Sequence, residues 1–238
     1  MNDQTYEIHV PTGEPYAVSI GRGLIHRVGA AAACVTGRRA LVVSDGNVAP
    51  LWGLPVRWSL EGAGFEVEDW TFPAGEQSKS PDMLMTLIHR AAELRLSRRD
   101  LVVALGGGVT GDMAGFAAAS YLRGIPFVQI PTSLLAQVDS SVGGKTGVDL
   151  PQGKNLVGAF WQPRLVLIDP DTLNTLPPRY FADGMGEVVK YGCIRSRALF
   201  DSLRDGQAWE RLEDIIYQCV DIKRQLVEND ERDKGERM

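Results

Sequence analysis

Cysteine and histidine are both scarce in this sequence. Its 238 residues include three cysteines and three histidines. The cysteines, Cys34, Cys193 and Cys219, are scattered and odd in number. They predict reduced thiols and exclude a disulfide framework or a zinc ribbon. Reduced thiols are typical of a cytoplasmic protein, and we expect that location.

Long apolar runs and an excess of positive charge are also missing. The sequence contains no apolar run of the roughly eighteen residues that a membrane helix needs, so we expect no membrane partner. Its N-terminal segment, MNDQTYEIHV, lacks the basic segment and the apolar core of a signal peptide. The formal net charge of −5 argues against bulk binding to nucleic acid.

What is present is a globular composition with an α/β pattern. Hydrophobic residues make up 44% and charged residues 23%, which suits one large domain or two modest ones. A helix is predicted over 80–97, with Ser80 as N-cap and Pro81 at its first position. Strands that alternate with helices predict an α/β layer with parallel strands. The predicted strands are 38–47, 64–75, 100–108, 127–134 and 164–170.

The pattern changes at the double proline, Pro177 and Pro178. From Phe181 onward the sequence has no strand candidate, and we predict helices over 180–194 and 209–238. The prolines predict a boundary between an α/β domain over 1–177 and a helical domain over 178–238. The sequence stops in a charged, helix-forming segment without a glycine cap, which is the pattern of an incomplete domain.

A glycine-rich turn follows the predicted strand 100–108. Gly106, Gly108 and Gly111 fit G-x-G-x-x-G, in which glycines let the backbone approach a pyrophosphate and a helix N-terminus faces the anion. A tight strand-to-helix turn without a ligand explains this segment equally well. The next strand has no acid at its end, whereas Asp45 ends an earlier strand. A bound dinucleotide would therefore extend its adenosine toward Asp45.

A second polar segment carries lysines on glycine-rich turns. Asp139, Lys145, Lys154 and Asn155 lie within it, between apolar strands. The alternative interpretation is a solvated hairpin whose lysines point to water. The sequence disfavours a phosphate-binding loop of the form G-x-x-x-x-G-K-T, because that loop needs glycine at the position of Asp139 and a strand that runs directly into it.

A carboxylate and a lysine share one face of the predicted helix 180–194. Glu187 and Lys190 are three residues apart, and a surface ion pair is the simpler interpretation. Gly184, Gly186 and Gly192 each cost about 1 kcal/mol of helix propensity relative to alanine, which favours close approach of another backbone or a ligand. A metal here would need further ligands. The histidines all lie in the N-terminal half and have no ligand spacing to Glu187.

Together, three motifs resemble the 3-dehydroquinate synthase family over nearly the whole chain. They are GEQSKS, which alone fits a surface loop with a helix cap, the block from GGGVTGDMAG to LVGAFWQP, and YFADGMGEVVKYG. The resemblance implies a Rossmann-like NAD-binding domain followed by an all-helical domain, with NAD and zinc or cobalt as cofactors. It also implies a homodimer and a phosphorylated sugar acid as substrate. The family is a carbon–oxygen lyase of the shikimate pathway, which converts 3-deoxy-D-arabino-heptulosonate 7-phosphate to 3-dehydroquinate with loss of phosphate.

The same resemblance implies roles for individual residues. Glu187 would be a metal ligand. The substrate contacts would be Asp139, Lys145, Asn155, Lys190 and, from a neighbouring subunit, Arg123, which would reach the phosphate. The NAD contacts would be Asp45, Asn47, Glu76, Lys79, Gly107, Gly108, Val109, Thr110, Gly111, Asp112, Thr132, Ser133, Leu135, Lys145, Lys154, Thr172, Leu173, Asn174 and Thr175.

The sequence departs from the family after DERDKGER. The histidines and later substrate residues of the helical domain are absent, so the chain resembles about the first two-thirds of the enzyme and supplies Glu187 as its one metal ligand. We therefore expect the isolated chain to bind zinc weakly and to be inactive. We also expect exposed apolar surface at IIYQCV, residues 215–220.

Two other interpretations remain open. One is a related enzyme, either another sugar-phosphate cyclase or a metal-dependent polyol dehydrogenase of the glycerol dehydrogenase type. The unbroken QVDSSVGGKTGVD block favours a 3-dehydroquinate synthase over this alternative. The other is an inert NAD-binding fragment, which a turnover assay with added zinc separates from an enzyme.

Overall fold

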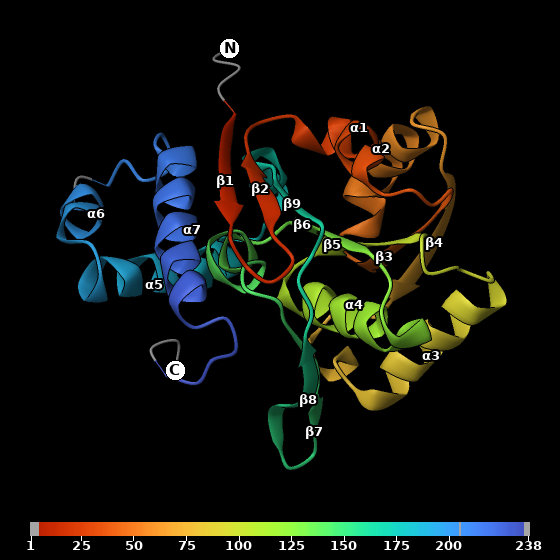
Figure 1. Ribbon diagram of the computed structural model, residues 1–238. Coiled ribbons are helices and arrows are strands. Elements are labelled where there is room, and N and C mark those ends of the chain that lie inside the picture. The colour runs from red at the N-terminus through yellow and green to blue at the C-terminus, as the bar shows by residue number, and fades with distance from the viewer. Residues whose placement is uncertain (1–4, 205, 236–238) are drawn as a thin grey trace.

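A mixed sheet forms the centre of the molecule (Figure 1). The computed structural model describes residues 5–204 and 206–235. Among these residues, seven strands form one sheet in the order β1-β2-β9-β6-β5-β3-β4. The first two strands pair antiparallel, and the other neighbours pair parallel. The strands are β1 (Tyr6–Val10), β2 (Tyr16–Ile20), β3 (Arg39–Asp45), β4 (Glu66–Phe72), β5 (Leu101–Gly106), β6 (Phe127–Pro131) and β9 (Leu165–Ile168).

Helices cover both faces of this sheet. Alternate residues of β5 belong to different apolar clusters: Leu101 packs with α2, whereas Val102 packs with α3 and α4. A strand that is buried on both faces reads as a continuous apolar run, which makes such strands recognisable in a sequence. The helices of this part are α1 (Val28–Ala31), α2 (Ala49–Gly62), α3 (Pro81–Glu93) and α4 (Gly108–Ser120). Shorter turns are η1 (Leu24–Arg27), η2 (Ala32–Cys34), η3 (Glu76–Ser78), η4 (Tyr121–Arg123), η5 (Ala136–Ser140) and η6 (Pro170–Thr175).

The predicted Rossmann-like α/β class of the N-terminal part is confirmed. Each of the predicted strand segments contains one strand, and all of these strands are parallel neighbours in the sheet. Helix α3 begins at Pro81, and the Ser80 hydroxyl accepts a hydrogen bond from the Met83 N–H at 3.3 Å. Because β3 lies beside β5, Asp45 and the glycine turn share the carboxyl edge of the sheet.

The lysine-bearing segment forms a hairpin of its own, as the alternative interpretation predicts. Strands β7 (Lys145–Leu150) and β8 (Gly153–Phe160) pair antiparallel and project from the body of the molecule (Figure 1). Their lysines do not simply point to water, because Lys145 and Lys154 both form ion pairs with carboxylates of other segments. The hairpin is therefore tied to the rest of the chain by charge.

Several elements are missing from the sequence-based prediction. The hairpin of β1 and β2 was missed although its strands do alternate, with Ile8 and Val10 buried in β1 and alternate residues from Tyr16 to Ile20 buried in β2. Helix α2 contains Pro55 in its interior, where proline is unfavourable, whereas its Pro50 lies in the first turn, where proline is tolerated. No helix in the described part of the chain is long and apolar enough to cross a membrane.

The C-terminal part is helical, as predicted. Among the described residues after Phe181 there is no strand, and the helices are α5 (Pro178–Ile194), α6 (Arg197–Ser202) and α7 (Leu212–Asn229). The predicted helix over 209–238 is too long, because α7 ends at Asn229. The Asp230 carboxylate then accepts the N–H groups of Lys234 and Gly235 and turns the chain. Residues 236–238 lie outside the described part.

The expectation of exposed apolar surface at IIYQCV is wrong for most of this segment. Ile215, Ile216, Cys219 and Val220 are buried in one apolar cluster with residues of β1 and β2. The N-terminal hairpin thus covers the face of α7 that sequence reasoning left without a partner. The Tyr6 hydroxyl closes this contact by donating to the Asp214 carboxylate at 2.5 Å.

Two of the three glycines around Glu187 mark close approach of another backbone, as expected. A Cβ at Gly184 would lie 2.7 Å from the Leu135 nitrogen, and a Cβ at Gly192 would lie 3.0 Å from the Phe200 Cα. At Gly186, in contrast, a Cβ would meet no described atom within 4 Å. Packing therefore explains Gly184 and Gly192, whereas Gly186 faces open space beside Glu187.

These glycines generate a matched pair of variants. We expect Gly184→Ala to destabilise the protein by roughly 1–3 kcal/mol, because its methyl group overlaps the 134–135 backbone. Gly186→Ala has room and gains helix propensity, so we expect it to stabilise by up to about 1 kcal/mol. Urea unfolding measures both values. Equal effects of the two variants would contradict the packing of α5 described above.

Candidate functional site

The glycine turn presents a bare helix N-terminus at the carboxyl edge of the sheet. Within residues 5–204 and 206–235, no side chain caps the first turn of α4, whose N-cap is Gly107. A Cβ at Gly106 would lie 2.3 Å from the Thr110 Oγ1, so only glycine fits there. This Thr110 oxygen is buried without a hydrogen-bond partner among the described residues. Uncapped N–H groups at a helix start can bind an anion such as a pyrophosphate.

The predicted adenosine contacts lie at the end of the neighbouring strand. The Asp45 Oδ1 accepts the N–H groups of Asn47 at 2.8 Å and Val48 at 3.1 Å, and so shapes the turn that leads into α2. From α2, the Trp52 Nε1 donates to the Thr175 Oγ1 at 3.1 Å. The structure thereby joins the turn after β3 to η6, which carries the last predicted NAD contacts.

Several other residues predicted to contact NAD are buried or form hydrogen bonds within the protein. Thr172 and Leu173 are buried, and the Thr172 hydroxyl donates to the Asp169 carbonyl at 2.8 Å. Thr132 is buried after β6, and the Ser133 Oγ accepts the Ala136 N–H. Leu135 and Asn174 are exposed. Their roles toward NAD stay predictions.

A buried ion pair ties the glycine turn to two other segments. Lys79 is 5% exposed, and its Nζ donates to the Asp112 carboxylate at 2.6 Å and to the side-chain oxygen of Asn155. These groups come from the loop before α3, from α4 and from β8. Burial raises the pKa of Asp112 to about 6, although the Lys79 ammonium acts in the opposite direction.

The neighbouring pair of Lys154 and Glu76 is a surface contact. The two charged groups lie 2.9 Å apart, with the Lys154 side chain 73% exposed. It joins the loop before α3 to the same hairpin as the buried pair does. An exposed ion pair contributes little to stability. The structure thus places Glu76, Lys79, Lys154 and Asn155 close together, and their roles toward NAD and substrate stay predictions.

A cavity of 510 Å³ lies beside the glycine turn. The sequence-predicted residues that line it are Asp112, Asp139, Lys145 and Asn155. Arg123 and Lys190 are not among its lining residues, and both are exposed. Arg123 follows Leu122 in a turn where both have positive φ, at 66° and 51°.

Sequence reasoning missed two charged residues of this cavity, Lys223 and Asp233. The Lys145 Nζ pairs with the Asp233 carboxylate at 2.6 Å. Lys223 was recognisable in principle, because it lies on the α7 face that carries the buried Ile216 and Cys219. A cation on the apolar face of a helix is unusual unless it has a partner.

Asp139 is the partner of Lys223. The Lys223 Nζ and the Tyr191 hydroxyl both donate to the Asp139 Oδ1 at 2.6 Å. Burial acts to raise the pKa of Asp139, but the Lys223 charge and these hydrogen bonds outweigh it and hold the pKa below its ordinary value. The carboxylate is therefore ionised at neutral pH.

Glu187 forms an ion pair with Lys190, which was the simpler interpretation of this helix. In the described part of the chain, no group of three or more His, Cys, Asp or Glu side chains could hold a metal ion. His9, on β1, pairs with Glu7 on the same strand. The described residues therefore do not form a metal site, and the role of Glu187 stays a prediction.

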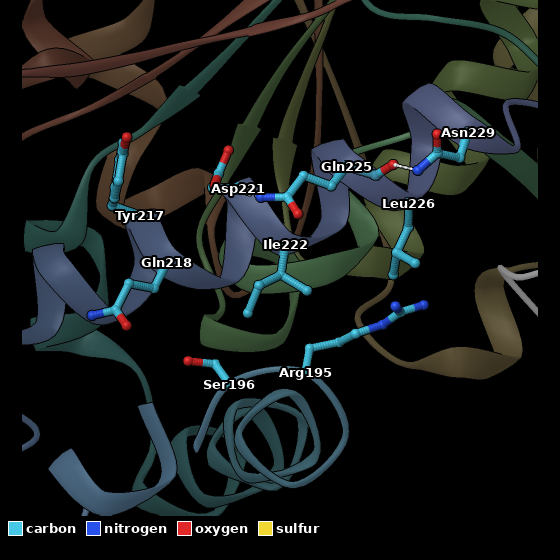
Figure 2. A pocket seen from close by; sticks show the side chains of 9 residues that line it. All are labelled: Arg195, Ser196, Tyr217, Gln218, Asp221, Ile222, Gln225, Leu226 and Asn229. Carbon is cyan, nitrogen blue, oxygen red and sulfur yellow. Dashed lines mark hydrogen bonds between the residues drawn. The ribbon is translucent and has the colours of Figure 1, made fainter. Parts of the chain in front are cut away.

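A second cavity lies away from these residues. It has a volume of 420 Å³ and lies between α7 and residues 195–196, which connect α5 to α6. Figure 2 shows Ile222 and Leu226 pointing from α7 toward Arg195 and Ser196. None of the sequence-predicted site residues lines this cavity.

The buried pair generates a prediction about protonation. Lys79→Met removes the cation that favours ionised Asp112, so we expect the pKa of Asp112 to rise above its value of about 6. Carbon-13 NMR of the carboxyl group measures it, and Lys154→Met, at the exposed pair, is the control. The pKa of Asp112 is higher in the folded than in the unfolded protein, so the folded state binds the proton more tightly. The free energy of unfolding of the wild type therefore increases through Asp112 as the pH falls from above 6 toward 4. A midpoint that stays unchanged in Lys79→Met contradicts the pairing.

Two solved structures with this fold contain NAD+ and a metal ion. A 2-deoxy-scyllo-inosose synthase in complex with carbaglucose-6-phosphate, NAD+ and Co2+ is 30% identical, with a TM-score of 0.85 over 97% of this chain and 65% of that chain. The 2-epi-5-epi-valiolone synthase of Streptomyces hygroscopicus, with NAD+ and Zn2+ bound, is 27% identical with a TM-score of 0.85, over 97% and 66% of the two chains. A glycerol dehydrogenase of Schizosaccharomyces pombe shares the fold, at 23% identity and a TM-score of 0.59 over 72% of this chain and 41% of that chain.

Sequence comparison is more specific. The 3-dehydroquinate synthase of Clostridium perfringens is 58% identical over 184 residues, which are 76% of this chain and 53% of that protein. The enzyme of Clostridium beijerinckii is 45% identical over 238 residues, 98% of this chain and 68% of that protein. The chain thus spans about half to two-thirds of these relatives. Residues 69–183 match the family described as 3-dehydroquinate synthase N-terminal and residues 184–238 match 3-dehydroquinate synthase C-terminal, so the chain belongs to the 3-dehydroquinate synthase family.

Proposed function

We propose that this chain carries the NAD site and part of the substrate site of a 3-dehydroquinate synthase. The reaction converts 3-deoxy-D-arabino-heptulosonate 7-phosphate to 3-dehydroquinate and breaks a carbon–oxygen bond to release phosphate. One observation carries the proposal: the cavity that holds Asp139, Lys145 and Asn155 opens beside an uncapped helix N-terminus. An anion-binding helix start next to a lysine-bearing cavity suits a dinucleotide beside an anionic substrate.

The cofactor would lie along the carboxyl edge of the sheet. Its pyrophosphate would bind the N–H groups of residues 107–112, and its adenosine would extend past β3 to Asp45 and Asn47. The buried Thr110 Oγ1, which has no hydrogen-bond partner among the described residues, fits a polar ligand at this turn. When bound, NAD would accept a hydride from the substrate and later return it. Glu76, Lys79, Lys154 and residues 172–175 would complete the site, with Thr132, Ser133 and Leu135 at the nicotinamide.

The substrate would lie in the cavity of 510 Å³. Lys145 is suited to the substrate's anionic groups, because its present partner, Asp233, is a carboxylate that a ligand carboxylate can replace. The Asn155 amide and the ionised Asp139 would hydrogen-bond substrate hydroxyls. Lys223 would hold Asp139 in its charged form, and Lys190 would approach from α5. Compact cations of this kind also stabilise oxyanions that develop during a reaction.

Zinc or cobalt is the proposed metal, with Glu187 as a ligand. The Glu187 carboxylate pairs with the exposed Lys190 side chain and would exchange this partner for the ion. A metal would polarise the substrate hydroxyl that NAD oxidises. The described residues do not supply the further ligands that zinc needs.

A homodimer is the proposed assembly. Arg123 would contact the substrate phosphate of the neighbouring subunit, a role that its exposed position beyond the cavity permits. Consecutive positive φ values at non-glycine residues are uncommon and often lie at functional turns. Sedimentation equilibrium tests the assembly, and a monomer at all concentrations would remove this role of Arg123.

A related cyclase is the second candidate, because the 2-deoxy-scyllo-inosose synthase has a TM-score of 0.85 to this chain. Calorimetric titration of NAD-saturated protein with 3-deoxy-D-arabino-heptulosonate 7-phosphate and with carbaglucose-6-phosphate distinguishes the two. We expect preference for the first ligand. Preference for the second favours the related cyclase, and binding of NAD alone favours an NAD-binding module.

The cofactor site can be tested at the glycine turn. We expect Gly108→Val to weaken NAD binding at least tenfold, because its side chain would cover the N-terminus of α4. Gly53→Val is the control, since a Cβ there, on the outer face of α2, meets no described atom within 4 Å. Isothermal titration calorimetry measures both affinities. Equal NAD affinity in Gly108→Val and wild type would mean that the turn does not bind the pyrophosphate.

The substrate site can be tested at Lys145. We expect Lys145→Ala to weaken binding of the sugar phosphate by at least tenfold and to leave NAD affinity within about twofold, because Lys145 lines the cavity and not the helix start. Calorimetry with each ligand in turn measures this split. The matched variant is Lys154→Ala, which removes an exposed lysine of the proposed NAD site that does not line the cavity, and it should lower NAD affinity more than sugar-phosphate affinity. An equal loss of both affinities in Lys145→Ala would move Lys145 to the cofactor side.

A further inference from the structure

Only one oxygen of the Asp139 carboxylate accepts hydrogen bonds from the described side chains. Tyr191 of α5 and Lys223 of α7 both donate to its Oδ1, each at 2.6 Å. Among the described residues, no group donates a hydrogen bond to its Oδ2. Asp139 is 24% exposed and lines the cavity of 510 Å³. The second oxygen is thus left to bind a ligand in that cavity.

The backbone around Asp139 is also unusual. Residues Ala136–Ser140 form a single π-helical turn. Such turns are rare and occur often at functional sites, because the wider turn redirects a side chain. The turn alone does not determine which carboxylate oxygen faces the cavity, since rotation about the last side-chain bond exchanges the two. The two hydrogen bonds donated to Oδ1 determine which oxygen faces the cavity.

The two donors differ in rigidity. The Lys223 ammonium lies at the end of a flexible four-carbon chain and can follow a rotating carboxylate. Tyr191 is 1% exposed, and its ring packs in the apolar cluster that includes Leu134, Val188 and Cys219. Dense packing fixes the position of the ring, and with it the position of the hydroxyl.

The Tyr191 hydroxyl stays protonated at neutral pH and is therefore a hydrogen-bond donor to Asp139. Burial raises the pKa of its phenol, and the negative charge of Asp139 raises it further. The Lys190 ammonium lies 5.5 Å from the centre of the ring. Burial and the Asp139 charge both favour the protonated hydroxyl, which is the form that donates to the ionised Asp139 carboxylate.

We propose that Tyr191 is a positioning residue that orients the Asp139 carboxylate, so that its Oδ2 accepts a hydrogen bond from a hydroxyl group of the bound sugar phosphate. This inference rests on the proposed function, in which Asp139 binds that substrate. Helix α5 would then serve the substrate site in two ways. It carries Glu187 and Lys190, and through Tyr191 it orients the Asp139 carboxylate of a neighbouring segment. Tyr191 itself does not touch the substrate.

Several charged and titratable groups act on Asp139. Lys190 and Tyr191 face it from α5, Cys219 and Lys223 face it from α7, and Asp112 of α4 lines the same cavity. The Tyr191 hydrogen bond favours the ionised carboxylate, so its removal has a defined direction. Loss of the phenol hydroxyl raises the pKa of Asp139, with Lys223 left as the main opposing influence.

The test compares Tyr191→Phe with Tyr121→Phe. Both variants keep the ring and lose one hydroxyl hydrogen bond, but Tyr121 bonds the Leu96 carbonyl at 3.0 Å, away from the cavity. Carbon-13 NMR follows the Asp139 carboxyl, which is assigned by its loss in Asp139→Asn. Calorimetry gives the affinities for NAD and, in NAD-saturated protein, for 3-deoxy-D-arabino-heptulosonate 7-phosphate.

In Tyr191→Phe we expect a raised Asp139 pKa. We also expect sugar-phosphate affinity to fall about tenfold, because a misoriented Asp139 loses its hydrogen bond to the substrate hydroxyl, and one hydrogen bond to a charged group contributes about that much. NAD affinity and the Tyr121→Phe variant should match wild type. An unchanged Asp139 midpoint, or unchanged sugar-phosphate affinity, overturns the proposal. If the wild type itself fails to bind the sugar phosphate, the proposed function fails and this inference fails with it. If the wild type binds normally but the Asp139 midpoint is unchanged in Tyr191→Phe, only the role of Tyr191 is removed.

A second readout does not require a folded variant. In wild type, the carbon-13 resonance of the Tyr191 ring carbon that bears the hydroxyl should shift as Asp139 titrates, with the same midpoint. A Tyr191 resonance that stays constant through that midpoint contradicts the contact and overturns the proposal.

Discussion

A buried ammonium must have partners, and the partners of Lys79 hold the site together. Its Nζ contacts the Asp112 carboxylate of α4 and the Asn155 side chain of β8. A lone buried charge would be strongly destabilising, so these segments must stay together for the fold to be stable. The hairpin β7–β8, which projects from the sheet, is thereby anchored beside the glycine turn.

The sheet places the remaining groups. The strands β3, β5, β6 and β9 run parallel, so the segments that follow them meet at one edge. Asp45, Gly107, Thr132 and η6 are far apart in the sequence and become neighbours there. The helical part then adds a second wall to the cavity, since Lys223 of α7 and Tyr191 of α5 both reach Asp139. The uncapped start of α4 and the lysine-bearing cavity thus lie side by side, with Asp112 of α4 among the lining residues.

Much of this arrangement could be predicted from the sequence, for physical reasons. Strands buried on both faces are continuous apolar runs, and the Ser80–Pro81 cap marks a helix start. The contacts across the sequence could not be predicted in this way. Only the structure brings β1 and β2 against α7, pairs Lys145 with Asp233 and places Tyr191 on Asp139. Each depends on tertiary packing, for which local patterns carry no signal. Family resemblance supplied residue roles, but Lys223 was missed because it lies outside the motifs that carry the resemblance.

The most direct test is a crystal structure of the protein with NAD and 3-deoxy-D-arabino-heptulosonate 7-phosphate. We expect the pyrophosphate on the N–H groups of residues 107–112 and the adenosine beside Asp45. The sugar phosphate should lie in the cavity between Asp139 and Lys145, with a hydroxyl group on the Asp139 Oδ2. NAD bound elsewhere, for example in the groove between α7 and residues 195–196, would contradict the proposed site.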